Sequence, residues 1–481
     1  MLMGRKLVLY GAGQRGRILC RILNELHTSN LMIVDSNIGL IGSEIEGYFV
    51  EEPEKIKEFH DCILCITISD KKEKHCVREK LINEFGYCDK QIITYEKVIL
   101  DAYTSSKEFF QQILDMKRNT VGGKDAVLFD CYNGLGFGGV EAWTMDLCCA
   151  RIKNGDSNVY VITDKGDYEV PYELKGQILS AYVDHSIHFS KDTVLDLIRI
   201  IMSKIPCKVV TCTVNEVMLA AYFVKKLCPD MVKVISVIHN SNEEVYERYM
   251  EFRECSDIYV GVSQDIKRDM IVRGICPTRV YSMTCPFACE KLLYREYTEN
   301  AAMPICIGYA GRMEYVQKRM DLFMKLMKTL KKRRVDFVME FAGDGTARCD
   351  MEAFVACNKL DSSIKFWGAL ERSEINDFWK RQDICINLSD YEGRCISKLE
   401  GMANGAVPVV TETAGAREDI TDGVNGFIIP LDDYCMAADR IEYLFQHRES
   451  LRKMGMLAHD AVYPKSSMES HLEFWEKIIG Y

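Results

Sequence analysis

Short apolar runs alternate with amphipathic stretches from the start of the chain. The run KLVLY at 6–10 precedes a helical pattern at 15–26, and the runs LMIVD and CILCITI follow. Runs of this length are typical of buried strands, and helices between them join parallel neighbours. The pattern therefore predicts a small α/β domain, followed by a connecting helix at 105–120.

The same alternation restarts twice further along the chain. AVLFD at 126–130 begins a second series of strands and helices, and ICIGYA at 305–310 begins a third. Each series is long enough for a doubly wound α/β domain. The expected parts are a small Rossmann-like domain at 1–118, a lobe at 121–300, a lobe at 301–465 and a final helix at 466–481.

Composition narrows the class of protein. The chain has 481 residues, of which 48% are apolar and 27% are charged, as is ordinary for a globular protein. A net charge of −10 argues against nucleic-acid binding, which needs a basic surface. No apolar run approaches the roughly eighteen residues of a membrane helix, and the first run is too short for a signal peptide. These features predict a cytoplasmic protein.

Cysteine usage agrees with that location. The 21 cysteines are scattered and often lie in apolar strands, as small hydrophobic residues do in a reducing compartment. Cys62 and Cys65 have the spacing of zinc ligands, but no second pair lies nearby. We therefore expect no metal site.

Two glycine-rich loops follow predicted strands. Gly11, Gly13 and Gly16 match G-x-G-x-x-G, and Asp35 ends the next strand. Such glycines let the backbone approach a pyrophosphate at a helix N-terminus, and the acid binds ribose. A tight turn with close packing explains the same pattern without a ligand. The motif recurs at Gly134, Gly136 and Gly139, followed by Asp164, which shows how easily it arises.

Redox chemistry is an alternative for the first domain. Tyr103 and Lys107 form a Tyr-x-x-x-Lys pair, in which the lysine could lower the tyrosine pKa for proton transfer. Among 24 tyrosines such pairs also arise by chance, and the domain is too short to add a substrate-binding half. A nucleotide such as NAD therefore stays an open expectation for 1–118.

Charged residues cluster after strands of the third domain. Arg312 and Lys318 follow the first strand, and Glu392 and Glu400 flank a glycine-bordered helix start. In open α/β sheets ligands bind at the carboxyl ends of the strands. The helix start near 393–397 favours an anion, and carboxylates bind hydroxyl groups. This set predicts a site for a sugar diphosphate.

Residues 125–481 resemble a retaining glycosyltransferase of family 4, which has the GT-B fold. The matching motifs occur in the family's order: GFGGVE, VIHN, VSQDIKRDMI, GYAGRMEYVQKRMD, FAGDG, Glu-x7-Glu and TETAGAREDITDGVNGFIIP. The expected fold is thus two doubly wound Rossmann-like lobes preceded by a small Rossmann-like domain. The motifs VLYGAGQRGR and IEGYFVEEPEKI make that first domain similar to the nucleotide-binding domain of some sugar-modifying enzymes.

The resemblance implies a role for each matching residue. Arg312 and Lys318 clamp the donor diphosphate, Glu392 contacts the transferred sugar, Glu400 binds the ribose, and His239 lies near the reacting sugar. The implied catalytic set is Glu392, His239, Arg312 and Lys318. The implied donor-binding set adds Gly138, Gly139, Gly343, Gly393, Arg394, Cys395, Ile396 and Glu400.

Some positions depart from the family's pattern. The family often has glycine after the lysine, where this chain has Arg319, and Pro-Ser where it has Leu388 and Ser389. Arg394 stands where an aromatic or small residue is common. These departures leave the donor unspecified, although a UDP-sugar is the commonest choice in the family.

The implied activity is metal-independent hexosyl transfer to a glycan or lipid-linked acceptor, in the synthesis of surface or cell-wall polysaccharide. The alternatives are a non-catalytic nucleotide-sugar scaffold, and a bifunctional protein with an NAD-dependent sugar-modifying domain. The basic run KLMKTLKKRR makes peripheral contact with the inner face of a membrane an alternative, although cations also suit a helix C-terminus. The extra domain makes a homodimer an open expectation.

Overall fold

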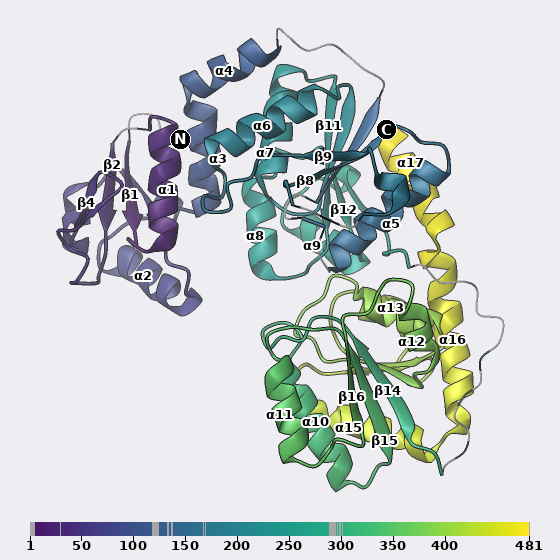
Figure 1. Ribbon diagram of the computed structural model, residues 1–481. Coiled ribbons are helices and arrows are strands. Elements are labelled where there is room, and N and C mark those ends of the chain that lie inside the picture. The colour runs from purple at the N-terminus through teal and green to yellow at the C-terminus, as the bar shows by residue number, and fades with distance from the viewer. Residues whose placement is uncertain are drawn as a thin grey trace. The chain divides into compact units, whose positions relative to one another are not determined.

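The structure is a computed structural model of the chain. It describes residues 5–28, 30–117, 125–131, 134–135, 138–166, 168, 170–287, 295, 297, 300 and 302–480. These residues form two compact units, one within 1–136, 156–236 and 246–258, and one within 137–155, 237–245 and 259–481. Figure 1 labels many of the elements, and three sheets organise them.

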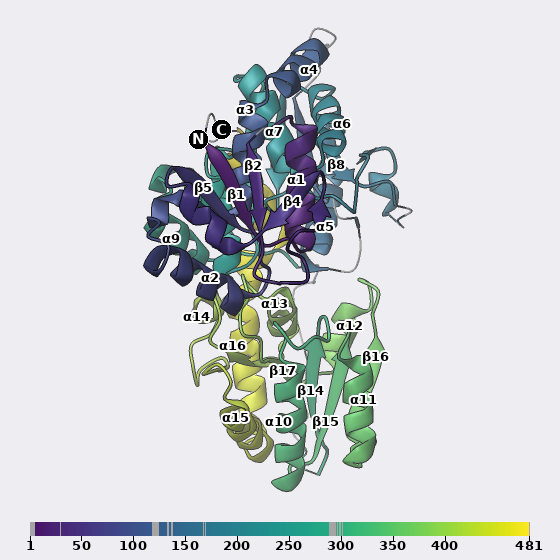
Figure 2. The ribbon, with the colours of Figure 1, turned by 90° about the vertical axis from the view of Figure 1, so that its left-hand side faces the viewer.

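The first sheet has six strands in the order β3-β4-β2-β1-β5-β6, and only β3 and β4 pair antiparallel. The strands are β1 (Lys6–Tyr10), β2 (Leu31–Val34), β3 (Glu44–Ile45), β4 (Tyr48–Glu51), β5 (Cys62–Ile66) and β6 (Ile92–Ile93). The helices beside them are α1 (Gln14–Glu25), η1 (Pro53–Glu58), α2 (Lys71–Asn83) and η2 (Asp89–Gln91). Figure 2 views the face where β1, β2 and α1 lie together.

Two connecting helices, α3 (Tyr95–Ser105) and α4 (Lys107–Lys117), follow the first sheet. Phe109 packs edge-on against Tyr103 and Phe223, with ring centroids 4.9 and 5.0 Å away. The Tyr103 hydroxyl donates a hydrogen bond of 2.7 Å to the carbonyl of Phe189. The tyrosine considered for proton transfer is therefore a buried packing residue.

The second sheet has seven strands in the order β13-β12-β11-β10-β7-β8-β9. They are β7 (Ala126–Asp130), β8 (Val159–Thr163), β9 (Ile178–Ser180), β10 (Cys207–Thr211), β11 (Val232–Ile238), β12 (Ile258–Gly261) and β13 (Val280–Ser282). The helices are α5 (Gly139–Lys153), η3 (Tyr172–Leu174), α6 (Lys191–Met202), α7 (Glu216–Leu227), α8 (Glu243–Glu251), α9 (Gln264–Val272) and η4 (Pro277–Arg279).

The third sheet is wholly parallel, in the order β16-β15-β14-β17-β18-β19. Its strands are β14 (Ile305–Ala310), β15 (Phe337–Ala342), β16 (Ile364–Gly368), β17 (Ile384–Asn387), β18 (Val407–Thr411) and β19 (Phe427–Ile429). The helices are α10 (Met320–Lys332), α11 (Arg348–Cys357), α12 (Ile375–Lys380), α13 (Ile396–Ala403), α14 (Ala416–Asp419), α15 (Tyr434–Gln446), α16 (Glu449–Ser466) and α17 (Met468–Gly480).

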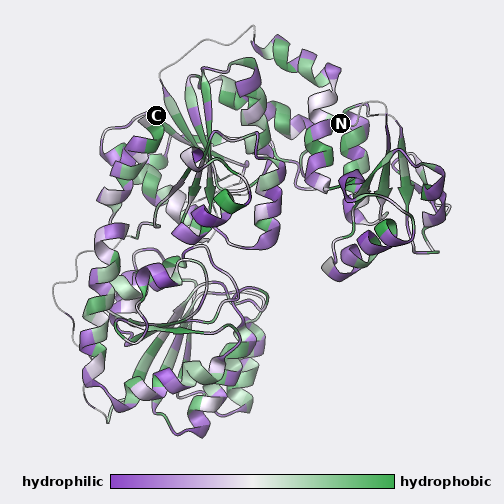
Figure 3. Ribbon diagram, turned by 180° about the vertical axis from the view of Figure 1, so that it is seen from behind, coloured by the Kyte–Doolittle hydropathy of each residue, from purple (hydrophilic) through white to green (hydrophobic). Residues whose placement is uncertain are grey.

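Each sheet buries apolar strands beneath amphipathic helices. The strands are mainly green in Figure 3, while most helices carry both colours, as helices at a surface do. An apolar stripe of α10 faces the core of the third sheet, with Phe323, Leu326 and Leu330 fully buried. The basic residue that follows, Arg333, pairs with Asp439 and Glu442 at 2.5 and 3.0 Å. In the part of the chain that the structure describes, no helix has the length and apolar character needed to cross a membrane.

Candidate functional site

The order of the third sheet reverses between β14 and β17. These strands are parallel neighbours, although two strand–helix units separate them in the chain. In open α/β sheets such a reversal leaves a crevice at the carboxyl ends of the two strands. The loop after β14 carries Arg312 and Lys318, and the loop after β17 carries Glu392.

Lys318 and Glu392 form a shielded ion pair at this reversal. The Lys318 Nζ lies 2.5 Å from the Glu392 Oε1, and the side chains are 14% and 8% exposed. Burial alone would lower the pKa of Lys318, but the attraction of the Glu392 carboxylate raises it. Asn387 also donates to Glu392 Oε1, at 3.4 Å. The structure thus places two predicted site residues, Lys318 and Glu392, next to each other as an ion pair.

Backbone contact brings His239 to the same place. The Ser241 hydroxyl donates to the Glu392 carbonyl at 2.7 Å. A Cβ on Gly393 would lie 2.1 Å from the His239 carbonyl oxygen, so only glycine fits there. The segment after β11 therefore lies directly against the loop that carries Glu392.

The His239 ring has an unused polar atom. Its ring packs edge-on against Trp143 at 4.9 Å, and burial lowers its pKa to about 3, so the imidazole is neutral. The buried Nε2 has no hydrogen-bond partner among the described residues. Because buried polar atoms are almost always satisfied, this nitrogen is suited to a ligand.

Helices α5 and α13 begin side by side near the Lys318–Glu392 ion pair. Helix α5 begins at Gly139 after Gly138, and α13 begins at Ile396 after Cys395, whose φ is 54°. A Cβ on Gly139 would lie 3.5 Å from Ile396 Cδ1. The first N–H groups of both helices lack partners in their own helix and favour an anion. Gly136 of the predicted glycine motif lies outside the described residues.

Glu400 is buried on α13 and has a partner that the sequence did not suggest. Arg372, in the loop after β16, pairs with Glu400 and donates to Asp146 of α5 at 2.9 Å. Burial alone would lower the pKa of Arg372, but the two carboxylates raise it. Its position after a strand of the third sheet is the signal that could have revealed it.

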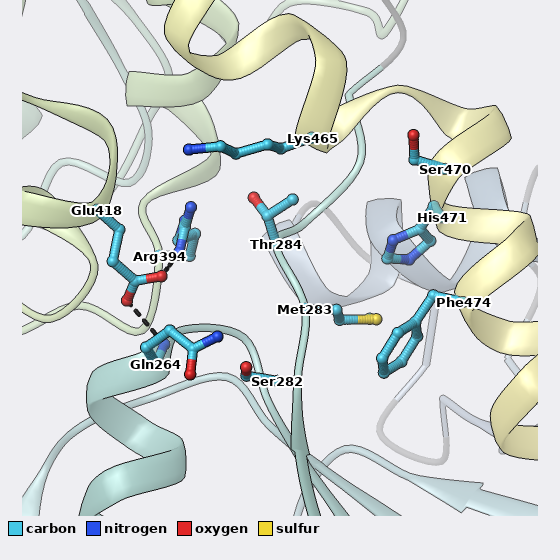
Figure 4. A pocket seen from close by; sticks show the side chains of 10 residues that line it. All are labelled: Gln264, Ser282, Met283, Thr284, Arg394, Glu418, Lys465, Ser470, His471 and Phe474. Carbon is cyan, nitrogen blue, oxygen red and sulfur yellow. Dashed lines mark hydrogen bonds and ion pairs between the residues drawn. The ribbon is translucent and has the colours of Figure 1, made fainter.

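Arg394 is held by carboxylates of its own unit. It pairs with Glu418, and its guanidinium donates to Asp419 at 2.6 Å, while Lys398 donates to the same carboxylate at 2.7 Å. Figure 4 shows Arg394 beside Glu418 on one side of a pocket of about 260 Å³, with His471 of α17 across from them. Because these carboxylates engage the Arg394 side chain, the predicted binding of a donor by Arg394 would use its backbone N–H.

The remaining predicted donor residues lie on the strand ends. Arg312 is 62% exposed and contacts Glu314 and Gln317 at 3.4 and 3.3 Å. Gly343 has φ 142°, and a Cβ there would lie 2.0 Å from the Gly311 carbonyl oxygen. Glycine is therefore required where β15 ends beside β14. Within the described ranges, no cluster of His, Cys, Asp and Glu is arranged to hold a metal ion.

The first glycine loop is closely packed except at one position. A Cβ on Gly16 would lie 2.2 Å from the Gly11 carbonyl oxygen, and Gly11 has φ 121°. Asp35 accepts hydrogen bonds of 2.7 Å from the backbone N–H groups of Ala12 and Asn37. A Cβ on Gly13 would meet nothing within 4 Å. Packing thus accounts for Gly11 and Gly16, and leaves space only at Gly13.

Two family models match separate parts of the chain. The family described as Glycosyl transferases group 1 matches residues 293–459, and a family described as C2185-like, N-terminal, matches residues 3–93. The first match lies mainly on the lobe that contains the third sheet, and the doubly wound sheets agree with the expected GT-B fold. The expected fold class is confirmed, including an additional α/β domain at the N-terminus.

Curated relatives match only parts of the chain. EpsD of Bacillus subtilis (strain 168) is 29% identical over 140 residues, which are 29% of this chain and 36% of EpsD. The poly(ribitol-phosphate) alpha-N-acetylglucosaminyltransferase of Staphylococcus aureus (strain COL) is 24% identical over 172 residues, or 35% of this chain and 34% of that protein. The chain thus spans less than half the length of these relatives.

Solved structures share the fold at low identity. HepE of Anabaena, solved with UDP-glucose, has a TM-score of 0.60 at 13% identity, covering 74% of this chain and all of that one. The lipopolysaccharide outer core galactosyltransferase WaaB has a TM-score of 0.60 at 15% identity, covering 74% and 99%. TarM of S. aureus, solved with UDP, has a TM-score of 0.52 at 13% identity, covering 99% and 100%.

Proposed function

We propose that the protein is a retaining glycosyltransferase that moves a hexose from a UDP-sugar to a glycan or lipid-linked acceptor. The observation that carries the proposal is the Lys318–Glu392 pair at the β14–β17 reversal, beside the starts of α5 and α13. One relative is named a poly(ribitol-phosphate) alpha-N-acetylglucosaminyltransferase, which supports polysaccharide synthesis. Two structural neighbours were solved with UDP-glucose or UDP, which supports a uridine donor.

In the proposed reaction the donor diphosphate lies against the two helix starts, with Lys318 and Arg312 as counter-charges. The bond between the anomeric carbon and the diphosphate oxygen breaks, and the acceptor hydroxyl bonds to that carbon on the same face. The leaving diphosphate takes the acceptor's proton. Stabilising the departing charge lowers the barrier, and removing one such cation costs about 3 kcal/mol, or about a hundredfold in rate.

The remaining residues position the donor. Glu392 faces the transferred sugar, the free Nε2 of His239 hydrogen-bonds it, and Glu400 binds the ribose hydroxyls. The proposal requires no metal, because the cations and helix starts supply the positive charge. A buried ion pair at Lys318 and Glu392 is costly to desolvate, which supports a ligand-binding role at this place. The proposal also includes peripheral contact with the inner face of a membrane and a homodimer.

The first domain has a separate candidate ligand. The open space at Gly13 is suited to the phosphates of a nucleotide such as NAD, at the start of α1. We propose nucleotide binding there as a second role, distinct from sugar transfer.

Calorimetric titration and thermal unfolding with UDP, GDP, ADP and NAD test the proposal, on wild type, Lys318→Ala and the exposed control Lys328→Ala. A ligand at a hundred times its Kd stabilises by about 2.7 kcal/mol, which raises the melting temperature by a few degrees. We expect UDP to bind wild type and Lys328→Ala, and to bind Lys318→Ala far more weakly. UDP binding that is absent, or indifferent to Lys318, contradicts the transferase.

A further inference from the structure

The residue after Lys318 has an unusual backbone conformation. Arg319 has φ 52° and ψ 53°, in the left-handed region that favours glycine. A non-glycine residue there costs on the order of 1 kcal/mol. An arginine at this position therefore needs a compensating interaction.

The side chain of Arg319 supplies that compensation. Its guanidinium lies 2.5 Å from Asp390 Oδ1 and 2.5 Å from Asp432 Oδ1, and its Nε donates to Asp321 Oδ1 at 3.0 Å. These carboxylates come from three segments: the start of α10, the loop after β17 and the loop after β19. The side chain is 19% exposed, so solvent screens these pairs only in part.

A neighbouring residue ties the same two loops together. The Gln317 Nε2 donates to the Tyr391 carbonyl at 3.0 Å, and the Asp390 N–H donates to the Gln317 carbonyl at 3.0 Å. The residues on both sides of Lys318 are thus bonded to the two residues before Glu392. The Lys318–Glu392 ion pair therefore lies beside these contacts between the two loops.

We propose that Arg319 is a positioning residue that holds the Lys318 ammonium ready for the donor diphosphate, by binding the loop after β14 to the loop of Glu392. This inference rests on the proposed function. A group that is ordered before the ligand arrives loses less entropy on binding, so the tie strengthens diphosphate binding without touching the ligand. Arginine suits the task because its planar fork reaches several carboxylates at once.

The test replaces Arg319 with the residue that its backbone prefers. Arg319→Gly removes the ionic ties and relieves the turn, and Arg319→Asn, which also tolerates this conformation, serves as a second variant. Arg334→Gly is the matched control, because Arg334 has φ 59° and lies exposed after α10, away from the site. Melting temperatures without ligand, and affinities for UDP and uridine by calorimetry, are measured for each.

We expect Arg319→Gly and Arg319→Asn to weaken UDP binding about tenfold, a loss that ordering one side chain can produce. Uridine, which has no diphosphate, binds both variants as it binds wild type. Arg334→Gly binds UDP normally. In a Lys318→Ala background, adding Arg319→Gly causes no further loss, because residues that act through one contact are not additive.

The results that contradict the positioning role of Arg319 differ from those that contradict the proposed function. Wild-type UDP affinity in the Arg319 variants, or an equal loss for UDP and uridine, overturns the positioning role. Additive losses in the double variant overturn it as well, because Arg319 then acts independently of Lys318. UDP binding that is indifferent to Lys318→Ala overturns the proposed function, and this inference with it.

Discussion

At the residue scale, Arg372 pairs with one carboxylate oxygen of Glu400, the residue that we propose binds the donor ribose. We expect Glu400→Gln to weaken UDP binding about tenfold, since hydrogen bonds to charged groups contribute roughly 1.5–3 kcal/mol. A UDP analogue that lacks both ribose hydroxyls binds wild type and variant alike. Calorimetric titration with the two nucleotides measures the difference.

The control for Glu400 is Glu352→Gln on α11, whose carboxylate also pairs with an arginine, Arg348 at 2.9 Å. Its loss leaves UDP binding unchanged, because α11 carries no part of the site. If Glu400→Gln weakens UDP and the dideoxy analogue equally, the carboxylate only holds Arg372, and ribose recognition lies elsewhere.

Some residues of the candidate site belong to a sequence motif, and others are recognised only from their contacts in the structure. Lys318, Glu392 and His239 could be predicted because each has a motif, and the structure places them together. The pairing of Arg372 with Glu400 and the tie from Arg319 to Asp390 could not, because these partners are distant in the sequence and meet only in the folded protein. Charge type alone does not tell which carboxylate a cation will reach.

At the element scale, α17 is fastened to α5 by a histidine that must stay neutral. The indole N–H groups of Trp143 and Trp475 both donate to His471 Nε2, at 3.0 and 3.3 Å. Burial, aided by the nearby His239, lowers the His471 pKa to about 3. Protonation would remove the acceptor that holds the two indoles.

Acid should therefore loosen this helix. Because the unfolded histidine has a pKa near 6.5, the unfolded state binds more protons below that pH, and stability falls by up to about 1.4 kcal/mol per pH unit. We expect His471→Gln, whose amide oxygen can accept the same bonds, to lose less stability between pH 7 and pH 5 than wild type. Urea unfolding at both pH values measures it.

The exposed His447 at the end of α15 provides the control. His447→Gln should keep the acid sensitivity of wild type. An equal loss in His471→Gln and wild type would show that other groups govern acid unfolding.

The start of α1 separates packing from ligand binding. Gly16→Ala forces a Cβ against the Gly11 backbone, and we expect it to destabilise by about 2 kcal/mol. Gly13→Ser enters open space and preserves the helix start, because serine is a favoured N-cap. Thermal unfolding should therefore show a loss only for Gly16→Ala. NAD stabilisation that survives in Gly13→Ser would contradict a nucleotide at this loop.

Long periodic elements were predictable, and short ones were not. The stripe of α10 and the strand β14 follow from apolar spacing, because burial on one or both faces sets the pattern. The β3–β4 hairpin and α14 have two to four residues in each element, too few to show a period. Their positions depend on neighbouring strands and on the Asp419 ion pairs.

At the scale of the whole molecule, α3 and α4 join two sheets of the first unit. Helix α3 contacts α1 and β5, and α4 contacts α6. Lys191 adds a second tie, since its N–H donates to Glu25 at 3.0 Å and its ammonium lies 3.1 Å from Glu108. The alternation of predicted strands and helices places a boundary near residue 118, but packing makes 95–117 part of a shared core.

A shared core predicts coupled unfolding of the two sheets. Phe109 is fully buried between Tyr103 and Phe223, so Phe109→Ala should destabilise by about 3–5 kcal/mol. Hydrogen exchange read by mass spectrometry should then show faster exchange in both β5 and β10. The control, Leu114→Ala on the same helix, removes a side chain that is 43% exposed and should change neither strand. Faster exchange in only one strand would mean that α3 and α4 connect two independently folding sheets, and that a ligand in the first domain could not alter the stability of the transferase lobe through this core.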